Sequence, residues 1–402
     1  MKKTITALIS TFAISLSLPT LVGEPTKALE TNTYIKILKD KTPIYENRKG
    51  VLEVVGYLKS NQQYLLNKDY NQNWFQIKMG NSFAYVSKLS SIKEKYPSYK
   101  NANVKYKNSK KTIKTITDTP VYDNTSGKLV DFATIKENRR YPVLYKAGNW
   151  WVVDISGRIG FVHNSKVKED KGVSVLMYHH LLKASENTNH RNNQTVTPEE
   201  FKAQMDYLHQ KGYETITTGQ LEQYIRGNLN LPAKTVLVTF DDGLKSVYLY
   251  AYPILKANNM KATEFMITSR VTNTPSNFNP IKLQTLSKTE MARMSDVFEF
   301  QGHTNNLHNI DSKKRSMLLS KTSSQIKQDL TLNKKFLNAK VFSYPFGQSN
   351  FKTVSALKQV GFTSAYTMDK GYVNIGDDVY KIKRFGIEPG MSLTAFKDIF
   401  EK

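Results

Sequence analysis

Residues 235–243 of this 402-residue chain read TVLVTFDDG. Six β-branched or other apolar residues run without interruption, and a paired aspartate and a glycine end the run. A run this short and this rich in β-branched residues predicts a buried strand rather than a helix. Asp242-Gly243 alone is a common turn sequence, so its meaning depends on the residues at the ends of the neighbouring strands.

The sequence around this segment, from Gly172 to the C-terminus, alternates apolar runs with segments of helical period. Two helix starts carry capping-box sequences, Thr197-Pro198-Glu199-Glu200 and Ser287-Lys288-Thr289-Glu290. We expect strands at Val173–Tyr178, Thr235–Phe240, Thr263–Ile267, Val297–Gln301, Val341–Tyr344, Phe362–Thr367 and Tyr380–Phe385. Strands that alternate with helices predict an α/β domain with a parallel sheet, and about seven such units predict a deformed or incomplete β/α barrel.

Parallel barrels place their chemistry at the C-terminal ends of the strands, where the connecting loops converge. Four of these ends carry distinctive segments: His179-His180, Asp241-Asp242-Gly243, residues 302–308 with His303 and His308, and Tyr344-Pro345-Phe346-Gly347. Four of the seven histidines of the chain therefore fall at one rim. Scattered residues would not give this arrangement.

Two histidines and one carboxylate at a common rim form a ligand set for a divalent metal with an open position, as in catalytic zinc sites. The chain has no cysteine, so thiol catalysis is excluded and any metal must be held by His and carboxylate side chains. Consecutive aspartates in extended backbone point to opposite sides, so one can bind the metal while the other acts as general base.

The first half of the chain contains an internal repeat. Three pairs of segments correspond in order: 42–47 with 119–124, 73–75 with 149–151, and 84–86 with 160–162. In each copy, short apolar runs separated by turn residues predict a small antiparallel β-barrel. Residues 94–111, rich in Lys, Asn, Ser and Tyr, are expected to link the two copies.

Each copy has Tyr near its start, Asn-Trp in the middle and Phe-Val or a similar pair at the end, and so resembles bacterial SH3-type modules. The resemblance covers residues 32–90 and 110–168. It implies two small all-β SH3-like barrels that hold a secreted enzyme on the cell wall. Trp74, Trp150 and Trp151 are either core or binding residues, and the sequence leaves both alternatives open.

The N-terminus has the layout of a secretory signal peptide. Met1-Lys2-Lys3 precede an apolar stretch from Ile5 to Leu18, and small and polar residues come next. We expect residues 1–28 to be removed and the protein to be secreted and extracellular or cell-wall associated, with an uncleaved N-terminal anchor as the alternative. We expect no integral membrane span after the signal is removed.

The chain is strongly basic, with 58 Lys and Arg against 34 Asp and Glu and a net charge of +24. In an exported protein this excess favours an anionic partner such as a wall polymer. Nucleic acid is not expected as a partner, because export removes the encounter.

The barrel segments resemble a known enzyme family. Thr239–Gly243, the His-Thr-x-x-x-His segment 303–308 and Tyr344–Gly347 look like the first three motifs of the NodB-homology polysaccharide deacetylases, carbohydrate esterase family 4. Val175–His180 is similar to the branch that contains the poly-N-acetylglucosamine deacetylases of biofilm exopolysaccharide. The resemblance covers residues 172–402.

The resemblance implies a metal site and a base. Asp242, His303 and His308 would bind the divalent metal, with Zn²⁺ as the first choice and Co²⁺, Ni²⁺ or Mn²⁺ as alternatives. Asp241 would be the general base.

The resemblance also implies the groups that face the substrate. Tyr344, Pro345 and Phe346 would lie at the substrate and oxyanion position, where a backbone N–H near Phe346 would stabilise the developing charge. His179 is the candidate general acid, and His180 is the weaker alternative.

Three departures from the family pattern matter. The metal-binding histidines are five residues apart instead of four, which separates them by about 140° on an ideal helix, so a loop must present them. Ser343 stands where the family has an Arg that braces the base, and Arg384 is the candidate substitute. No histidine comes after His308, so the usual late general acid is missing and an early His must supply it.

The sequence therefore predicts an exported, metal-dependent N-deacetylase that acts on an N-acetylglucosamine-containing cell-surface polysaccharide, either peptidoglycan or poly-N-acetylglucosamine. The alternative is a wall-binding protein that retains the deacetylase fold with little catalysis, which Ser343 and the missing late histidine would favour. A nucleic-acid-binding protein would rest on charge alone.

Overall fold

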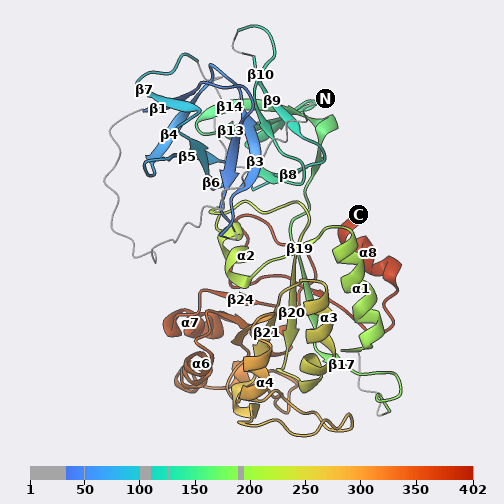
Figure 1. The fold of residues 1–402 in the computed structure, drawn as a ribbon. Helices are drawn as coiled ribbons and strands as arrows, with labels where there is room; N and C mark the ends of the chain where they lie inside the picture. Colours follow the sequence, from blue (N-terminus) through green and yellow to red (C-terminus); the bar gives the residue numbers. More distant parts are fainter. Residues whose placement is uncertain (1–32, 49, 100–109, 125, 189–193, 402) are drawn as a thin grey trace, which may run out of the picture.

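The computed structural model describes residues 33–401, except 49, 100–109, 125 and 189–193. The chain forms an all-β region followed by an α/β domain, stacked end to end (Figure 1). The predicted signal peptide, residues 1–28, lies outside the described residues, as does most of the predicted linker.

The all-β region is antiparallel, as predicted. Its strands are β1 (Tyr34–Ile37), β2 (Thr42–Glu46), β3 (Glu53–Leu58), β4 (Gln63–Asp69), β5 (Trp74–Met79), β6 (Ser82–Ser87), β7 (Ser91–Glu94), β8 (Thr112–Thr115), β9 (Thr119–Asp123), β10 (Val130–Ile135), β11 (Arg140–Pro142), β12 (Tyr145–Ala147), β13 (Trp150–Ile155), β14 (Arg158–His163) and β15 (Val167–Glu169). One sheet has the order β12-β13-β14-β9-β10-β3-β2-β6-β5-β4-β1-β7, and a smaller sheet has the order β11-β8-β15.

The two copies of the repeat are joined through equivalent strands. β3 of the first copy pairs with β10 of the second, and β5 meets β13 at Met79 and Ile155. Gly56 permits this close approach, because an added Cβ would lie 2.4 Å from the carbonyl oxygen of Thr134. Buried residues of both copies form one apolar cluster. The shared core suits copies of this size, because a domain of about 60 residues buries too little surface to be more than marginally stable alone.

The structure distinguishes the three tryptophans. Trp151 is only 3% exposed and belongs to the core. Trp74 and Trp150 are half-buried, and each packs edge to face on a tyrosine, Tyr45 at 5.5 Å and Tyr122 at 5.9 Å between ring centroids. The repeat therefore places an equivalent, partly exposed Tyr/Trp pair on each copy.

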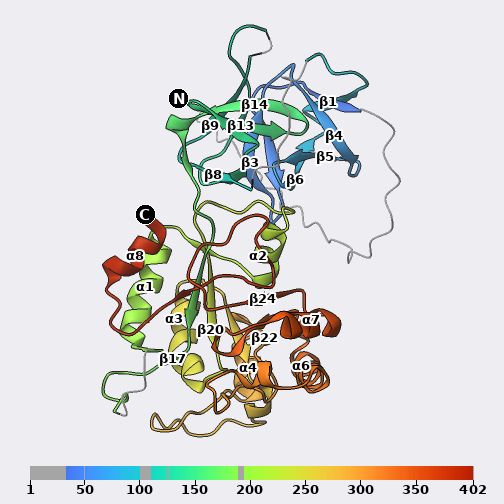
Figure 2. The same cartoon turned by 180° about the vertical axis from the view of Figure 1, so that it is seen from behind.

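The α/β domain contains a parallel sheet with helices around it (Figure 2). Its elements are β16 (Ser174–Tyr178), β17 (His180–Leu181), β18 (Thr195–Val196), α1 (Pro198–Gln210), β19 (Glu214–Thr215), α2 (Thr218–Ile225), β20 (Thr235–Asp241), α3 (Tyr252–Ala257), β21 (Ala262–Met266), α4 (Lys288–Arg293), β22 (Phe298–Gly302), α5 (Met317–Ser320), α6 (Ser323–Leu337), β23 (Val341–Ser343), α7 (Phe351–Val360), β24 (Ser364–Tyr366), β25 (Phe385–Gly386) and α8 (Leu393–Glu401). The main strand order is β24-β23-β22-β21-β20-β16-β25, with β19 beside β20. The predicted fold class, an incomplete β/α barrel, is confirmed.

Local sequence explains most of these elements. The capping boxes before α1 and α4 are both present, with Thr197 and Ser287 as the N-caps. The strand expected at Tyr380–Phe385 is the exception, because only the two-residue β25 is regular. A turn in which the amide N–H of Lys381 donates to the carbonyl of Asp378 interrupts the segment, and Ile382 joins β24 through a single parallel bridge to Tyr366.

The β region is attached to the N-terminal ends of the barrel strands. Arg140, 1% exposed, pairs with Asp170 and donates to the carbonyls of Pro232 and Ala233 at 3.1 and 3.3 Å. Pro232 and Ala233 lie just before β20, so the C-terminal rim of the sheet faces away from the β region (Figure 1).

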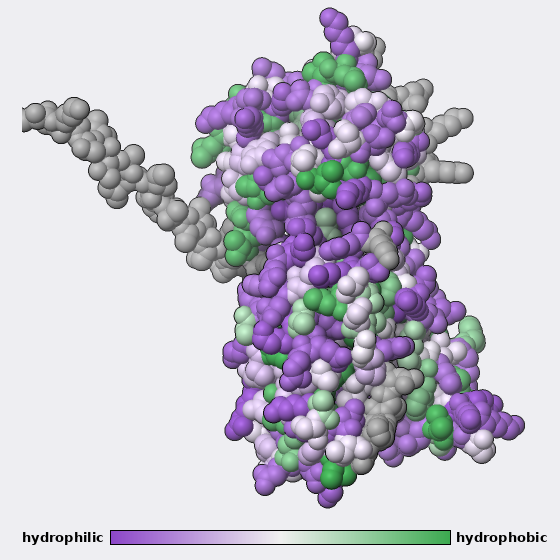
Figure 3. All heavy atoms as spheres, turned by 90° about the vertical axis from the view of Figure 1, so that its right-hand side faces the viewer, coloured by the Kyte–Doolittle hydropathy of each residue, from purple (hydrophilic) through white to green (hydrophobic). Residues whose placement is uncertain are grey.

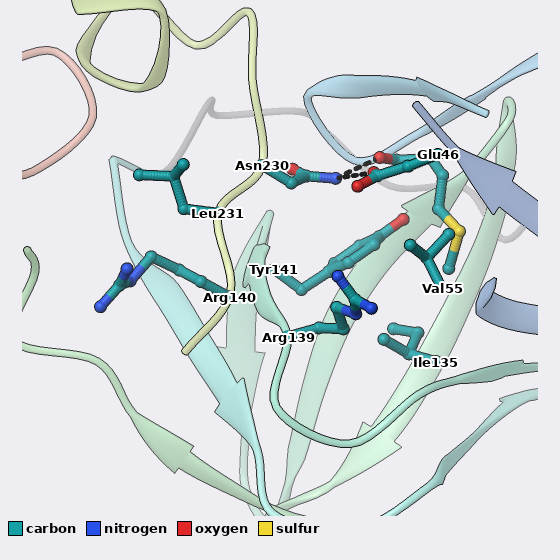
Figure 4. A pocket seen from close by; sticks show the side chains of 9 residues that line it. Glu46, Val55, Ile135, Arg139, Arg140, Tyr141, Asn230 and Leu231 are labelled. Carbon is teal, nitrogen blue, oxygen red and sulfur yellow. Dashed lines mark hydrogen bonds between the residues drawn. The ribbon is translucent and has the colours of Figure 1, made fainter. Parts of the chain in front are cut away.

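A second contact involves Asn230. Its Nδ2 donates to the carbonyl of Met79 at 2.6 Å, and its Oδ1 accepts from the amide of Asn81 at 3.0 Å. Its side chain also faces Glu46 across a small pocket at the junction (Figure 4). The first copy of the repeat therefore holds the loop that leads into β20.

The surface is largely hydrophilic on the face shown in Figure 3, where apolar residues form small separate groups. Across the described ranges, no helix has the length and apolar character needed to cross a bilayer.

We expect Asn230→Ala to lower the free energy of unfolding by about 1–3 kcal/mol, because it leaves the amide of Asn81 and the carbonyl of Met79 without this partner. Asn228→Ala is the matched control, since Asn228 is exposed and bonds only to Gln223 by its side chain; its effect should stay within about 0.5 kcal/mol. Urea unfolding measures both, and equal losses would contradict the assigned role of Asn230.

Candidate functional site

The C-terminal rim of the sheet brings together three side chains that the sequence singled out. Asp242 directly follows β20, and His303 directly follows β22. With His308, they place one ligand atom each within 4.8 Å of one another. The Oδ1 of Asp242 lies 3.5 Å from Nε2 of His303 and 3.2 Å from Nε2 of His308.

The protonation of these groups suits a cation. Nδ1 of His303 lies 2.7 Å from the carbonyl oxygen of Ser343, and donation there leaves the Nε2 lone pair directed at Asp242. Burial and the neighbouring His303 lower the pKa of His308 to about 4, so this ring is neutral at pH 7. Nearby histidines lower the pKa of Asp242 more than its burial raises it. Oδ1 of Asp242 accepts no hydrogen bond from any described residue although it is buried. A carboxylate and two imidazole rings whose ligand atoms lie this close together fit a divalent metal with N and O ligands.

The segment from His303 to His308 is a loop, as its five-residue spacing requires. Two buried residues of α6 hold it. The carboxylate of Asp329 accepts the amides of Asn305 and Asn306 at 2.8 and 2.7 Å, and Nδ2 of Asn333 donates to the carbonyl of Thr304 at 2.7 Å. The loop is therefore fixed by side chains from a helix rather than by its own secondary structure.

The sequence analysis did not identify these two α6 residues as part of the site. Asp329 and Asn333 are four residues apart, on the same helix face as the buried Ile326 and Leu330. A polar residue on the apolar face of an amphipathic helix is the sequence pattern that would have pointed to Asp329 and Asn333, because a buried polar group requires a hydrogen-bond partner.

Asp241 lies beside the candidate metal ligands and is held by Arg384. Nη1 and Nη2 of Arg384 donate to Oδ1 and Oδ2 of Asp241 at 2.7 and 2.8 Å, and Ser343 donates to Oδ2 at 3.0 Å. Arg384 also donates to the hydroxyl of Ser343 at 2.8 Å. Burial raises the pKa of Asp241, but Arg384 outweighs it and the pKa falls to about 2.

The two early histidines have different surroundings. His179 is 8% exposed; burial lowers its pKa, while the charges of Asp241 and Asp242 act in the opposite direction. His180 lies in the short β17 and pairs with Thr195 of β18. His179 therefore interacts electrostatically with both aspartates of the rim.

The motif Tyr344-Pro345-Phe346 divides into buried and exposed parts. Tyr344 is fully buried and packs on Phe342, 5.7 Å between ring centroids, and Pro345 is also buried. The Tyr344 side chain therefore packs in the core, and the expectation that Tyr344-Pro345-Phe346 lies at the substrate and oxyanion position stays a prediction. Phe346 is 42% exposed and its ring lies 4.8 Å from that of His308.

Unusual backbone conformations gather at this rim. Asp242, Thr304 and Phe346 have φ values of 81°, 73° and 59°, in the left-handed region that side chains disfavour. Each lies within or beside one of the three segments that build the site. Such strain is maintained only where the surrounding structure fixes it, and it is common at functional sites.

Several known proteins are similar to part of this chain. Residues 228–365 match the family model for polysaccharide deacetylases. The chain is 26% identical over 253 residues to the poly-beta-1,6-N-acetyl-D-glucosamine N-deacetylase of Staphylococcus epidermidis, covering 58% of this chain and 86% of that protein. It is 28% identical over 236 residues to the Staphylococcus aureus (strain MSSA476) protein of the same name, covering 54% and 79%. The Streptococcus pyogenes deacetylase PplD, solved in complex with acetate, is 26% identical with a TM-score of 0.49, covering 57% of this chain and 98% of that one.

We expect Arg384→Met to destabilise the protein by about 3–5 kcal/mol, because it leaves the buried carboxylate of Asp241 without a charged partner. Ser343→Ala, which removes one neutral donor to the same carboxylate, should cost about 1 kcal/mol. Urea unfolding at pH 7 compares them. A loss for Arg384→Met no larger than that for Ser343→Ala would contradict the ion pair as the main support of Asp241.

Proposed function

We propose that this chain belongs, through its α/β domain, to the polysaccharide deacetylases, which are hydrolases of amide C–N bonds; the match of residues 228–365 to their family model supports this. We infer that it removes acetyl groups from N-acetylglucosamine residues of a cell-surface polysaccharide. The observation that carries the proposal is the pair of adjacent aspartates at the end of β20, one facing two histidines and the other held by Arg384.

The proposed metal site consists of Asp242, His303 and His308. Zn²⁺ is our first choice, and Co²⁺, Ni²⁺ and Mn²⁺ suit the same ligands. When bound, the cation supplies Lewis acidity toward water and toward the amide carbonyl.

Asp241 is proposed as the general base. Its Oδ2 accepts two hydrogen bonds, whereas Oδ1 accepts one and keeps a lone pair for the proton of the attacking water. A pKa of about 2 keeps this carboxylate ionised at neutral pH. Bidentate contact with Arg384 also fixes its orientation, which a base requires as much as the correct charge.

The remaining steps use Phe346 and His179. The backbone N–H of Phe346 would donate to the carbonyl oxygen as the water adds to the carbon, where negative charge develops. His179 would then protonate the departing nitrogen by passing on the proton that Asp241 took from the water. The C–N bond breaks as the new C–O bond is kept, which yields acetate and a free glucosamine amine.

Arg384 also weighs against the alternative of a catalytically weak binding protein. That alternative rests partly on Ser343, yet Ser343 and Arg384 both bond to Asp241. The proposed base, Asp241, is therefore held by Arg384 rather than by an arginine at position 343. The missing late histidine is the remaining argument for a catalytically weak binding protein.

We further propose that the protein is exported and docks on the cell wall through its two SH3-like modules, residues 32–90 and 110–168. The partly exposed Tyr45/Trp74 and Tyr122/Trp150 pairs support this role, because amphipathic aromatic residues are frequent in binding surfaces.

Substitution of each aspartate should separate metal binding from turnover. Asp242→Ala should abolish both metal binding and acetate release, because it removes a ligand. Asp241→Asn should retain the metal but lower kcat by about 10²–10⁴-fold, the usual contribution of a general base. Metal content of the purified variants and acetate release measure the two effects, and full activity of Asp241→Asn would remove it as the base.

Acetate release by the purified protein tests the reaction itself. We expect release from poly-N-acetylglucosamine or peptidoglycan, its loss with a chelator, and its recovery with added Zn²⁺ or Co²⁺. The polymer that yields acetate identifies the substrate. A folded protein that binds wall material but releases no acetate from either polymer would favour the binding protein instead.

A further inference from the structure

Glu264 is a buried carboxyl group that the proposed mechanism does not use. It lies in the middle of β21, beside Phe240 of β20 and Phe300 of β22, and its side chain has no solvent exposure. Oε1 accepts the amide N–H of Gly243 at 2.8 Å. Oε2 has no hydrogen-bond partner among the described residues.

The charge state of Glu264 depends on its surroundings. Burial raises the pKa of Glu264 well above its ordinary value, and the nearby carboxylates of Asp241 and Asp242 add to this effect. Arg384 is already engaged with Asp241, and within the described ranges no cation is shown beside Glu264. In either protonation state an oxygen of this carboxyl group can accept the amide N–H of Gly243, as Oε1 does here.

The bond from Gly243 to Glu264 acts on a strained turn. Asp242 and Gly243 have φ values of 81° and 70°, so two consecutive residues leave the strand in the left-handed region. The peptide is held from both sides, since the carbonyl of Gly243 accepts the amide of Leu286 at 2.9 Å while its N–H points to Glu264. Without Glu264, a buried N–H would lack an acceptor directly after the residue that carries the candidate metal ligand.

We propose that Glu264 is a positioning residue: by accepting the amide of Gly243 it fixes the Asp242-Gly243 turn and, through it, the direction of the Asp242 carboxylate toward His303 and His308. The inference rests on the proposed metal site but not on the identity of the substrate. Partners behind metal ligands commonly change metal affinity by about 10–100-fold when they are removed.

Three variants of the full protein test this role. Glu264→Met keeps the volume but removes the acceptor, and we expect Co²⁺ affinity to fall by about 10–100-fold with a changed visible absorption spectrum of the bound Co²⁺. Glu264→Gln keeps an acceptor oxygen at the same length, and should restore affinity to within about threefold and the original spectrum. Glu264→Asp shortens the side chain by one methylene, so its carboxyl no longer reaches the amide of Gly243, and we expect the same loss of Co²⁺ affinity as in Glu264→Met. This variant provides the test if Glu264→Met does not fold.

Glu299→Met is the matched control. Glu299 on the neighbouring β22 also accepts a backbone amide, that of Thr218 at 2.7 Å, but near the start of its strand rather than at the rim. Its replacement should lower the melting temperature without altering Co²⁺ affinity or spectrum. The proposal would be overturned if folded Glu264→Met or Glu264→Asp bound Co²⁺ with wild-type affinity. It would also be overturned if Glu264→Gln lost as much Co²⁺ affinity as Glu264→Met. Because Co²⁺ binding is measured without substrate, failure here is distinct from failure of the deacetylase assignment.

Discussion

The buried contact between Asp241 and Arg384 is the interaction on which the site depends. The two residues are 143 positions apart in sequence, and the side chains are 3% and 0% exposed. Two charges removed from water are stable only when paired with good geometry, and here two parallel hydrogen bonds supply it. The pair therefore requires that the last segment of the sheet, whose β25 pairs with β16, pass within reach of the end of β20. The path of this segment and the ionisation of Asp241 are a single constraint.

The same contact explains how this chain dispenses with an arginine at position 343. A serine there is short enough to leave room for the guanidinium of Arg384, and its hydroxyl joins both partners of the ion pair. The brace is thus supplied by the end of the sheet instead of by the motif that contains Pro345. Residue identity at one motif position is a poor guide to activity when another strand reaches the same point in space.

The sequence predicted the rim of the site better than its supports. Apolar runs located β16, β20, β21 and β22, and the rule that chemistry follows parallel strands brought Asp242, His303 and His308 to one place. Asp329 and Asn333 could not be assigned in this way, because helical period shows that a position is buried but not which loop its side chain will hold. The motif at Tyr344 shows the same limit, because its sequence does not reveal that the Tyr344 side chain packs in the core. The expected strand Tyr380–Phe385 is interrupted by a turn that begins at Asp378. How this turn changes the pairing with neighbouring strands depends on tertiary contacts, which the local sequence does not show.

The charges at the rim have a consequence for product release. The anionic Asp241 is balanced by Arg384, whereas Asp242 faces the two histidines of the proposed cation site. Under the proposed function, a divalent cation there would leave the site net positive, which would favour the developing oxyanion and disfavour the ammonium group formed when the acetyl group leaves. The full chain carries a net charge of +24, so its field would act in the same direction on a polymer that becomes more cationic with each turnover.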